Sequence, residues 1–261
     1  MDWRIGTSAH SRHSASSTSG RARYQAPTAV RSIPLGQLLA RIGLPQLPPK
    51  QFDDLLRSFT TDEVKDLKLY YSGDLSLLER PTVAIVGTRK ASIEGRARAR
   101  RLARELVGAR VTIMSGLARG IDTEALQSAI ASGGKTVAVI GTPLSRAYPA
   151  ENARLQEEIY SHHLLVSPFA EGEVVFKSNF PKRNRIMAAL SAATVIVEAG
   201  ETSGTLHQAT ACQRLDRWLF LAKAVVDNPT LEWPARFIGK AKTAVLHRTE
   251  DVIAAIRHAN A

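Results

Sequence analysis

The sequence predicts an α/β fold built on a doubly wound, mainly parallel sheet, with a short helical lead-in at the N-terminus. Two observations point to this class. From Pro81 onward, short runs of β-branched and apolar residues alternate with amphipathic helical segments, as in parallel sheets with crossover helices. The chain has 261 residues, of which 44% are hydrophobic, which is enough for a substantial core.

The N-terminal part of the chain lacks this alternation. Residues 8–29, SAHSRHSASSTSGRARYQAPTA, are rich in Ser, Ala and Arg with almost no large apolar residue, so we expect residues 1–32 to form a disordered tail. Residues 33–78 show weak helical patterns interrupted by prolines, which predicts a small helical segment. Residues 79–261 are expected to form the α/β domain.

Seven strands are expected in this domain, at residues 82–87, 111–116, 136–141, 164–168, 193–200, 218–222 and 243–247. Between the first two lies the arginine-rich segment EGRARARRLARELVGA, whose apolar residues share one face of a helix. We interpret its arginines as a solvated helix face and not as a nucleic-acid site.

Charge and composition limit the possible functions. The formal net charge is +11, of which residues 1–32 carry +4 and the remaining chain +7, so the domain is basic without its tail. This excess favours a polyanionic partner, either nucleic acid or an anionic surface. The chain contains no apolar run of membrane-spanning length and no secretory h-region, and its single Cys212 excludes an intramolecular disulfide. We therefore expect a cytoplasmic protein that does not associate with membranes.

The loops that follow the strands suggest a phosphate-binding site, because doubly wound sheets bind ligands at the carboxyl ends of their strands. Three loops combine glycines with cations: GTRKAS (87–92), SGLARGID (115–122) and SNFPKRNRIMAALS (178–191). Glycines let backbone N–H groups approach a phosphate, and cations supply the countercharge. The residues expected to do so are Gly87, Arg89, Lys90, Gly116, Arg119, Gly120, Lys182, Arg183 and Arg185.

The third loop predicts a helix beginning near Lys182. Cations are unfavourable at a helix start, because the backbone N–H groups there already carry partial positive charge, unless the cations bind an anionic ligand. The helical phase places Arg183 on the apolar stripe, pointing inward, and Arg185 on the opposite side. An internal salt bridge from Arg183 to Glu198 or Asp122 is the alternative to a ligand, and simple solvent exposure is the alternative for Lys182 and Arg185.

A fourth loop, in EAGETSGTLHQATA, offers the hydroxyls of Ser203 and Thr205 beside Gly204, which opens the next helix. The hydroxyls could bind an anion and Glu198 could accept from a sugar or base. Alternatively, Ser203 is a helix N-cap and Glu198 a satisfied carboxylate. His207, on the same helix, is either pocket-lining or structural.

Motifs typical of several enzyme and cofactor classes are missing. The sequence contains no GxxxxGK[ST] loop, no three-glycine dinucleotide fingerprint, no GxSxG and no HExxH. His162 and His163 are the only clustered histidines and have no cysteine nearby, so we expect no metal site. No catalytic residue and no cofactor are predicted.

Five segments together resemble a known family. VAIVGTRKAS, SGLARGIDTEA, GGKTVAVIGTPLSRAYPAEN, FPKRNRIMAALS and VIVEAGETSGTLHQA are similar, in order and spacing, to the DNA-processing protein A family, also called DprA or Smf. The resemblance covers residues 70–221. It implies an extended Rossmann-like domain that binds single-stranded DNA, forms a homodimer, is not an enzyme and loads a RecA-type recombinase during natural transformation and DNA recombination.

The resemblance also implies a set of pocket residues. They are Gly87, Thr88, Arg89, Ser115, Gly116, Arg119, Lys182, Arg183, Asn184, Arg185, Ser203, Gly204 and Thr205. Single-strand binding usually adds aromatic stacking. Tyr148, Phe169 and Phe180 are candidates, and we favour Phe180 because it adjoins the cations.

The sequence departs from the family pattern at Leu126, where a histidine is usual, and at residues 221–226, which lack the usual Pro-Gly. Both changes are expected at the pocket rim, and no C-terminal winged helix is expected. Besides DNA binding, two functions stay open: a nucleotide- or DNA-sensing module, for example a partner in phage defence or a toxin–antitoxin system, and a nucleotide phosphoribohydrolase.

Overall fold

The computed structural model describes residues 24–59 and 66–258, and the expected tail at residues 1–23 lies outside this range. Within it, one nine-stranded sheet organises the chain. The strands are β1 (Arg31–Pro34), β2 (Lys68–Gly73), β3 (Thr82–Gly87), β4 (Thr112–Ser115), β5 (Thr136–Val139), β6 (Leu164–Ser167), β7 (Ala193–Glu198), β8 (Trp218–Ala222) and β9 (Thr243–Leu246). All seven strands expected from the sequence are confirmed, each within two residues of its expected bounds.

Helices alternate with the strands along the chain. The α-helices are α1 (Leu35–Arg41), α2 (Pro49–Arg57), α3 (Ile93–Gly108), α4 (Ile121–Ala131), α5 (Ala153–His162), α6 (Asn179–Leu190), α7 (Thr205–Arg214), α8 (Lys223–Val226) and α9 (Thr249–His258). Short 3₁₀ turns lie at Leu75–Glu79, Ala150–Asn152 and Trp233–Arg236. In the described part of the chain, no helix has the length and apolar character needed to cross a membrane.

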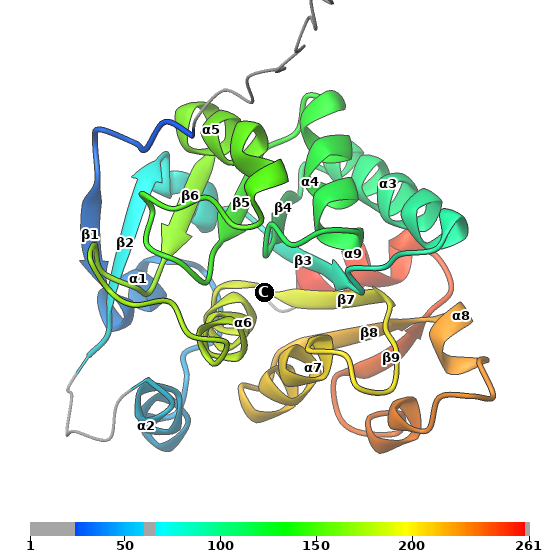
Figure 1. Cartoon of the computed structure of the whole chain (residues 1–261). Helices are drawn as coiled ribbons and strands as arrows, with labels where there is room; N and C mark the ends of the chain where they lie inside the picture. Colours follow the sequence, from blue (N-terminus) through cyan, green and yellow to red (C-terminus); the bar gives the residue numbers. More distant parts are fainter. Residues whose placement is uncertain (1–23, 60–65, 259–261) are drawn as a thin grey trace, which may run out of the picture.

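The strand order is β1-β2-β6-β5-β4-β3-β7-β8-β9, and every pairing from β6 to β9 is parallel. From β3 the chain moves outward through β4, β5 and β6, and returns to β7 on the other side of β3 (Figure 1). The doubly wound Rossmann-like fold is thus confirmed. Its topological switch point, where ligands bind in such sheets, lies at the carboxyl ends of β3 and β7.

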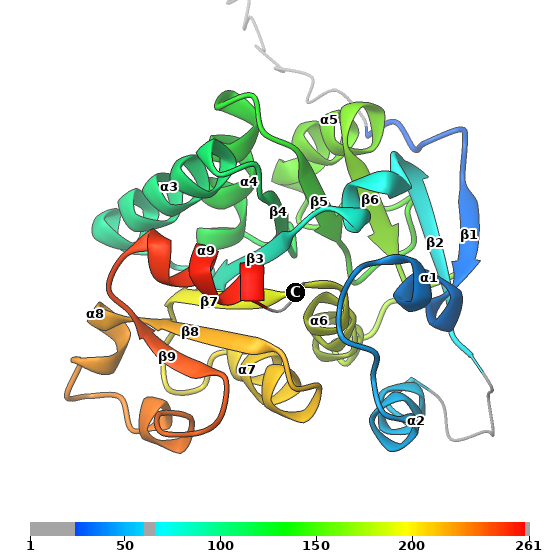
Figure 2. The ribbon, with the colours of Figure 1, turned by 180° about the vertical axis from the view of Figure 1, so that it is seen from behind.

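The central strands are buried on both faces, which explains their nearly continuous apolar runs. In β3, Val83 and Ile85 join the core beneath α3 and α4, whereas Ala84 and Val86 join the core shared with α6 and α7. Figures 1 and 2 show α3 and α4 on one face of the sheet and α6 and α7 on the other. The alternation of side chains along β3 therefore anchors the two helix layers that meet at the switch point.

The lead-in is less helical than expected. Helices α1 and α2 are present, but β1 and β2 extend the sheet by antiparallel pairing, β1 with β2 and β2 with β6. Their residues are a mixture of polar and apolar side chains, and they form strands because β2 pairs with the free side of β6 and β1 then pairs with β2 as the edge strand.

Residues 24–30 also differ from the expected disordered tail. The Tyr24 hydroxyl donates to the Leu144 carbonyl (2.7 Å), and the Tyr160 hydroxyl donates to the Gln25 carbonyl (2.8 Å). These contacts attach the segment to the surface around α5.

The arginine-rich face of α3 is held by neighbouring carboxylates. Arg96 and Arg100 both pair with Glu124 of α4, at 3.0 and 2.7 Å, and Arg101 pairs with Glu105 at 2.7 Å. Their side chains remain 43–71% exposed. The solvated-face interpretation agrees with these contacts, since α3 presents its arginines to solvent and to α4.

Candidate nucleic-acid interface

A pocket of about 510 Å³ lies at the switch point. It is enclosed by the loop after β3, the start of α4, the first half of α6 and the loop between β7 and α7. The predicted residues that line it are Gly87, Thr88, Arg89, Lys90, Phe180, Arg183, Asn184, Ser203, Gly204 and Thr205. Segments more than 100 residues apart in the sequence therefore meet at one pocket, which we call the main pocket.

Helix α6 begins at Asn179, with Ser178 at its N-cap, and not near Lys182 as expected. Pro181 is accommodated within the first turn, where its missing N–H costs nothing. The cations Lys182, Arg183 and Arg185 consequently lie beyond the first three residues of the helix. The unfavourable effect of the helix dipole is weaker there, so the dipole does not by itself demand a ligand.

Arg183 points inward, as the helical phase predicts, and only 4% of its surface is exposed. Its Nη1 donates to the Val139 carbonyl at 2.5 Å. A Cβ atom on Gly116 would lie 1.9 Å from the same nitrogen, so Gly116 leaves the room that the guanidinium occupies. Burial lowers the pKa of Arg183 to about 10, and the negative charge of Asp122 opposes this change.

Asp122 is the buried counter-charge of this arginine. Its carboxylate accepts from the backbone N–H groups of Gly116 (3.1 Å) and Ala118 (3.4 Å). Burial raises the pKa of Asp122, while Arg183 and these N–H groups act in the opposite direction. Of the two partners considered for Arg183, Asp122 is the one whose charge acts on it, but no ion pair joins the two side chains among the described residues. Asp122 also holds the loop before α4 in place.

Glu198 is satisfied at its strand end. It accepts from the backbone N–H of Ser92 at 3.1 Å and from the Ser92 hydroxyl at 2.6 Å, which ties the end of β7 to the N-terminus of α3. This arrangement agrees with the structural alternative for Glu198.

An aromatic and cationic cluster borders the main pocket. The rings of Tyr148 and Phe180 lie 5.1 Å apart, and the Arg89 guanidinium lies 5.5 Å from the centroid of the Phe180 ring. Phe180 is half-buried above Gly141, where a Cβ atom would come within 2.8 Å of the ring, and Tyr148 is 43% exposed. Phe169, the third stacking candidate, is only 5% exposed, so that prediction is wrong.

Hydroxyl groups and a helix N-terminus form the opposite side of the pocket. The Ser203 hydroxyl donates to Thr205 Oγ1 (2.9 Å) and accepts from the Thr205 N–H (3.3 Å). The Asn184 amide donates to the Gly204 carbonyl at 3.2 Å, which joins α6 to this loop. The N-cap position of α7 is Gly204 and not Ser203, and the first N–H groups of the helix are already bonded. The Thr205 N–H donates to the Ser203 hydroxyl, the Leu206 N–H to the Ser203 carbonyl and the His207 N–H to the Gly204 carbonyl.

Comparison with known proteins agrees with this geometry. The family model described as DNA recombination-mediator protein A matches residues 49–257. The chain belongs to this family. The match begins before and ends after residues 70–221, where the sequence motifs lie, so it includes α2 and α9.

The relatives are bacterial proteins. DNA processing protein DprA of Streptococcus pneumoniae is 44% identical over 146 residues, which cover 56% of this chain and 50% of the relative. The crystal structure of DprA from Streptococcus pneumoniae superposes with a TM-score of 0.66 at 33% identity, covering 81% of this chain and 75% of that one.

A second solved structure concerns single-stranded DNA binding by DNA processing protein A from Helicobacter pylori. It has a TM-score of 0.66 at 27% identity and covers 82% of this chain and 95% of that one. The chain spans about half the length of the curated relatives it matches.

Several predicted site residues do not line the main pocket but support its walls. The Ser115 hydroxyl donates to the Ile85 carbonyl (2.6 Å) from a fully buried position. Gly120 adopts a φ of 77°, and a Cβ atom there would lie 2.3 Å from the Thr88 carbonyl oxygen. Gly116 and Gly120 therefore make room for protein atoms rather than for a ligand.

Three predicted cations also point elsewhere. Arg119 pairs with Glu151 at 2.5 Å, and Lys182 donates to the Phe59 carbonyl at 3.1 Å. Arg185 lines a different pocket, between α2, α6 and α7, as does His207. Sequence proximity to the loops identified these residues, but it carried no information on the direction of their side chains.

Three residues that were not predicted also line the main pocket: Met187, Thr202 and Gln208. Thr202 adjoins Ser203 in a loop already identified, so its position was a usable signal. The family departures lie away from the pocket: Leu126 is fully buried in the core around α4 and α5, and Lys223 pairs with Asp227 beside β8. The expectation that both touch the pocket rim is wrong.

Proposed function

We propose that this chain binds single-stranded DNA in the main pocket, protecting the strand during DNA processing, and that residues 79–261 are the DNA-binding domain. The observation that carries the proposal is the cluster of Arg89, Phe180 and Tyr148 at the edge of a cationic pocket at the switch point. The similarity to DNA processing protein A from Helicobacter pylori, whose solved structure concerns its single-stranded DNA binding mode, supports the same function.

The chemistry of the pocket suits a phosphate-linked ligand. Arg89 and Lys90 are exposed and form no ion pair within the described residues. They are therefore available to phosphates. The buried Arg183 also raises the local positive potential, while Asp122 neutralises part of its charge.

The aromatic edge favours a single strand over a duplex. Phe180 and Tyr148 can stack only on bases that are not covered by neighbours in a duplex, and such stacking contributes about 1–3 kcal/mol per base. A cationic groove beside a stacking surface is the arrangement that holds single strands without base-specific hydrogen bonds.

The test is fluorescence anisotropy with labelled oligothymidylates of increasing length, the matching duplex, and competing mononucleotides, across a salt series. We expect affinity that rises with length, prefers single strands and falls with salt. The Arg89→Ala/Lys90→Ala variant should lose most of this binding, whereas Arg101→Ala/Arg104→Ala on α3 should not. Equal affinity of the two variants would contradict the proposal.

Two other functions make different predictions in the same assay. A nucleotide-sensing module would bind weakly, independently of strand length, and a mononucleotide would displace the strand. A nucleotide phosphoribohydrolase would release free base from a nucleoside monophosphate, and chromatography of the mixture would detect it. We propose that the chain has no such activity.

We further propose that the protein acts in the cytoplasm as a homodimer and transfers the bound strand to a RecA-type recombinase. The family description, DNA recombination-mediator protein A, supports this role. Analytical ultracentrifugation tests the dimer. Recombinase assembly on strands coated with a single-strand-binding protein, with and without this chain, tests the transfer.

A further inference from the structure

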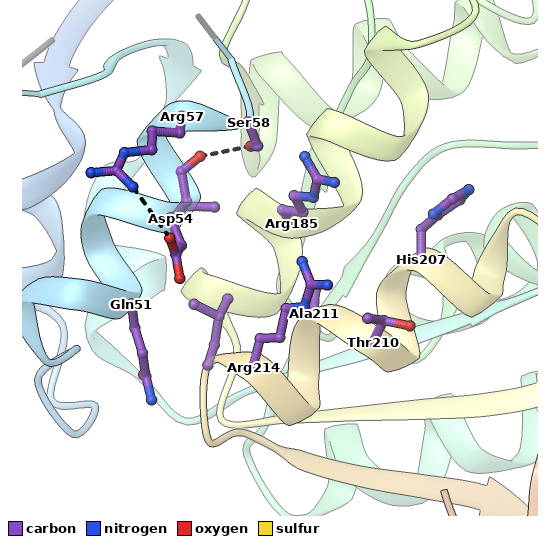
Figure 3. A pocket seen from close by; sticks show the side chains of 11 residues that line it. Gln51, Asp54, Arg57, Ser58, Arg185, His207, Thr210, Ala211 and Arg214 are labelled. Atoms are coloured by element: carbon purple, nitrogen blue, oxygen red, sulfur yellow. Dashed lines mark hydrogen bonds and ion pairs between the residues drawn. The ribbon is translucent and has the colours of Figure 1, made fainter. Parts of the chain in front are cut away.

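A second pocket, of about 350 Å³, lies between α2, α6 and α7 (Figure 3). Each helix contributes one arginine: Arg57 from α2, Arg185 from α6 and Arg214 from α7. His207 lies two turns before Arg214 on the same face of α7. We call this cluster the triple-arginine pocket.

The charges of the triple-arginine pocket are poorly compensated. Within residues 24–59 and 66–258, Arg185 and Arg214 form no ion pair. Arg57 has only a 4.0 Å contact with Asp54, between two exposed side chains. Burial and the nearby positive charge of Arg214 together lower the pKa of Arg185.

Holding the Arg185 and Arg214 guanidinium groups near each other opposes folding, because like charges repel and Arg185 is partly removed from water, whereas the exposed Arg57 turns towards Asp54 (Figure 3). A bound anion would reverse this effect. Guanidinium groups match phosphate especially well, since their planar fork donates two parallel hydrogen bonds.

The triple-arginine pocket adjoins the main pocket through two helices. Asn184 lines the main pocket and its neighbour Arg185 lines the other, and on α7 the same holds for Gln208 and His207. The two pockets thus lie on either side of the contact between α6 and α7. A helix with its side chains is about 10–12 Å wide, so a strand a few nucleotides long can reach from one to the other.

We propose that the triple-arginine pocket is a second phosphate subsite, which binds the backbone of the same DNA strand where it leaves the main pocket. This inference rests on the proposed function, since it extends that site. It makes strand length the determinant of affinity: a short strand fills the main pocket alone, and a longer one also engages Arg185 and Arg214.

The experiment measures anisotropy with labelled oligothymidylates of about 4 and about 20 nucleotides, which span the usual range of single-strand site sizes. The Arg185→Gln/Arg214→Gln variant should weaken binding of the longer strand about tenfold and leave the shorter one unchanged. Losing two phosphate contacts should also reduce the slope of log K against log salt by about 1.4.

Two further variants serve as controls. Arg101→Gln/Arg154→Gln removes the same formal charge from exposed positions on α3 and α5, and should change either affinity by less than about twofold. Arg185→Lys/Arg214→Lys keeps the charge and should preserve the salt slope, which tests the subsite even if the glutamine variant folds poorly.

The outcomes separate the two proposals. If the glutamine variant matches the Arg101→Gln/Arg154→Gln control at both lengths, the subsite is refuted while the main pocket stands. An equal loss of affinity for both strands also refutes the subsite, because the substitutions then weaken binding in the main pocket itself. If unlabelled polyglutamate, and not DNA, binds in a manner that depends on Arg185 and Arg214, the pocket belongs to an acidic protein segment. Failure of the wild-type chain to bind either strand would overturn the proposed function itself.

Discussion

Replacing Arg183 by methionine tests whether two buried opposite charges, Arg183 and Asp122, stabilise each other beside the main pocket. Methionine matches the length of the arginine stem and removes only the guanidinium. The change leaves Asp122, which is 4% exposed, without its positive neighbour, and it removes the donor to the Val139 carbonyl. Breaking a buried pair by removing one partner costs about 3–5 kcal/mol, because the remaining charge stays buried and uncompensated.

A double-mutant cycle isolates the pairing. Asp122→Asn keeps an oxygen to accept from the N–H groups of Gly116 and Ala118 while removing the charge. The Arg183→Met/Asp122→Asn variant should therefore be more stable than the sum of the single losses predicts, by about 1–3 kcal/mol. Urea denaturation followed by tryptophan fluorescence gives the free energies of unfolding.

The matched control is Arg185→Met, two residues further along α6. This side chain is half-buried beside a like charge and forms no ion pair within the described residues, so its loss should cost less than about 1 kcal/mol. The reasoning is refuted if Arg183→Met costs no more than Arg185→Met, or if the cycle is additive within about 0.5 kcal/mol.

Three further predictions concern Phe180 at the edge of the main pocket, Gly120 before α4 and the buried His163. Phe180→Ala should weaken strand binding by about 1–3 kcal/mol in anisotropy, without changing the salt slope. Gly120→Ala should lower the melting temperature because of its φ of 77° and the 2.3 Å approach to a carbonyl oxygen, whereas Gly108→Ala, with open space around it, should not. Burial lowers the pKa of His163 to about 4, so the unfolded chain binds its proton first and stability falls as pH drops from about 6.5 towards 4. The free energy of unfolding should be about 2 kcal/mol lower at pH 5 than at pH 8. Urea unfolding at both pH values should show that this pH-dependent difference is absent in His163→Gln and retained in His162→Gln.

The seven parallel strands could be predicted because strands buried on both faces are continuous apolar runs, visible without any partner. Strands β1 and β2 could not. Their mixed composition, with Lys68 and Tyr70 alternating with Leu69 and Tyr71, suits an exposed edge as well as a loop, and their pairing depends on β6, which lies about 90 residues further along the chain. Tertiary context decided their state.

The site was predictable to the level of loops. Parallel strands end at one edge of the sheet, so the loops with glycine and cations had to gather there, and the four identified loops do. Within them, side-chain direction was beyond prediction: Ser115 and Gly116 face the protein interior, and Arg119 turns to Glu151. The order of the chain determines which residues belong to each loop, whereas the direction of each side chain depends on atoms contributed by other segments.

Arg183 and Arg185 illustrate what the sequence determined and what only the tertiary structure decided. By itself, the sequence determined the α/β class, the edge where the loops meet, the excess positive charge and the helical phase, which turns these two arginines about 200° apart. Only the tertiary structure decided the surroundings of each one: the charge of Asp122 and the main pocket for Arg183, and the charge of Arg214 and the second pocket for Arg185. The physical reason is that the period of a helix is a local property of the backbone, whereas the surroundings of each face depend on how α2, α4 and α7 pack against it.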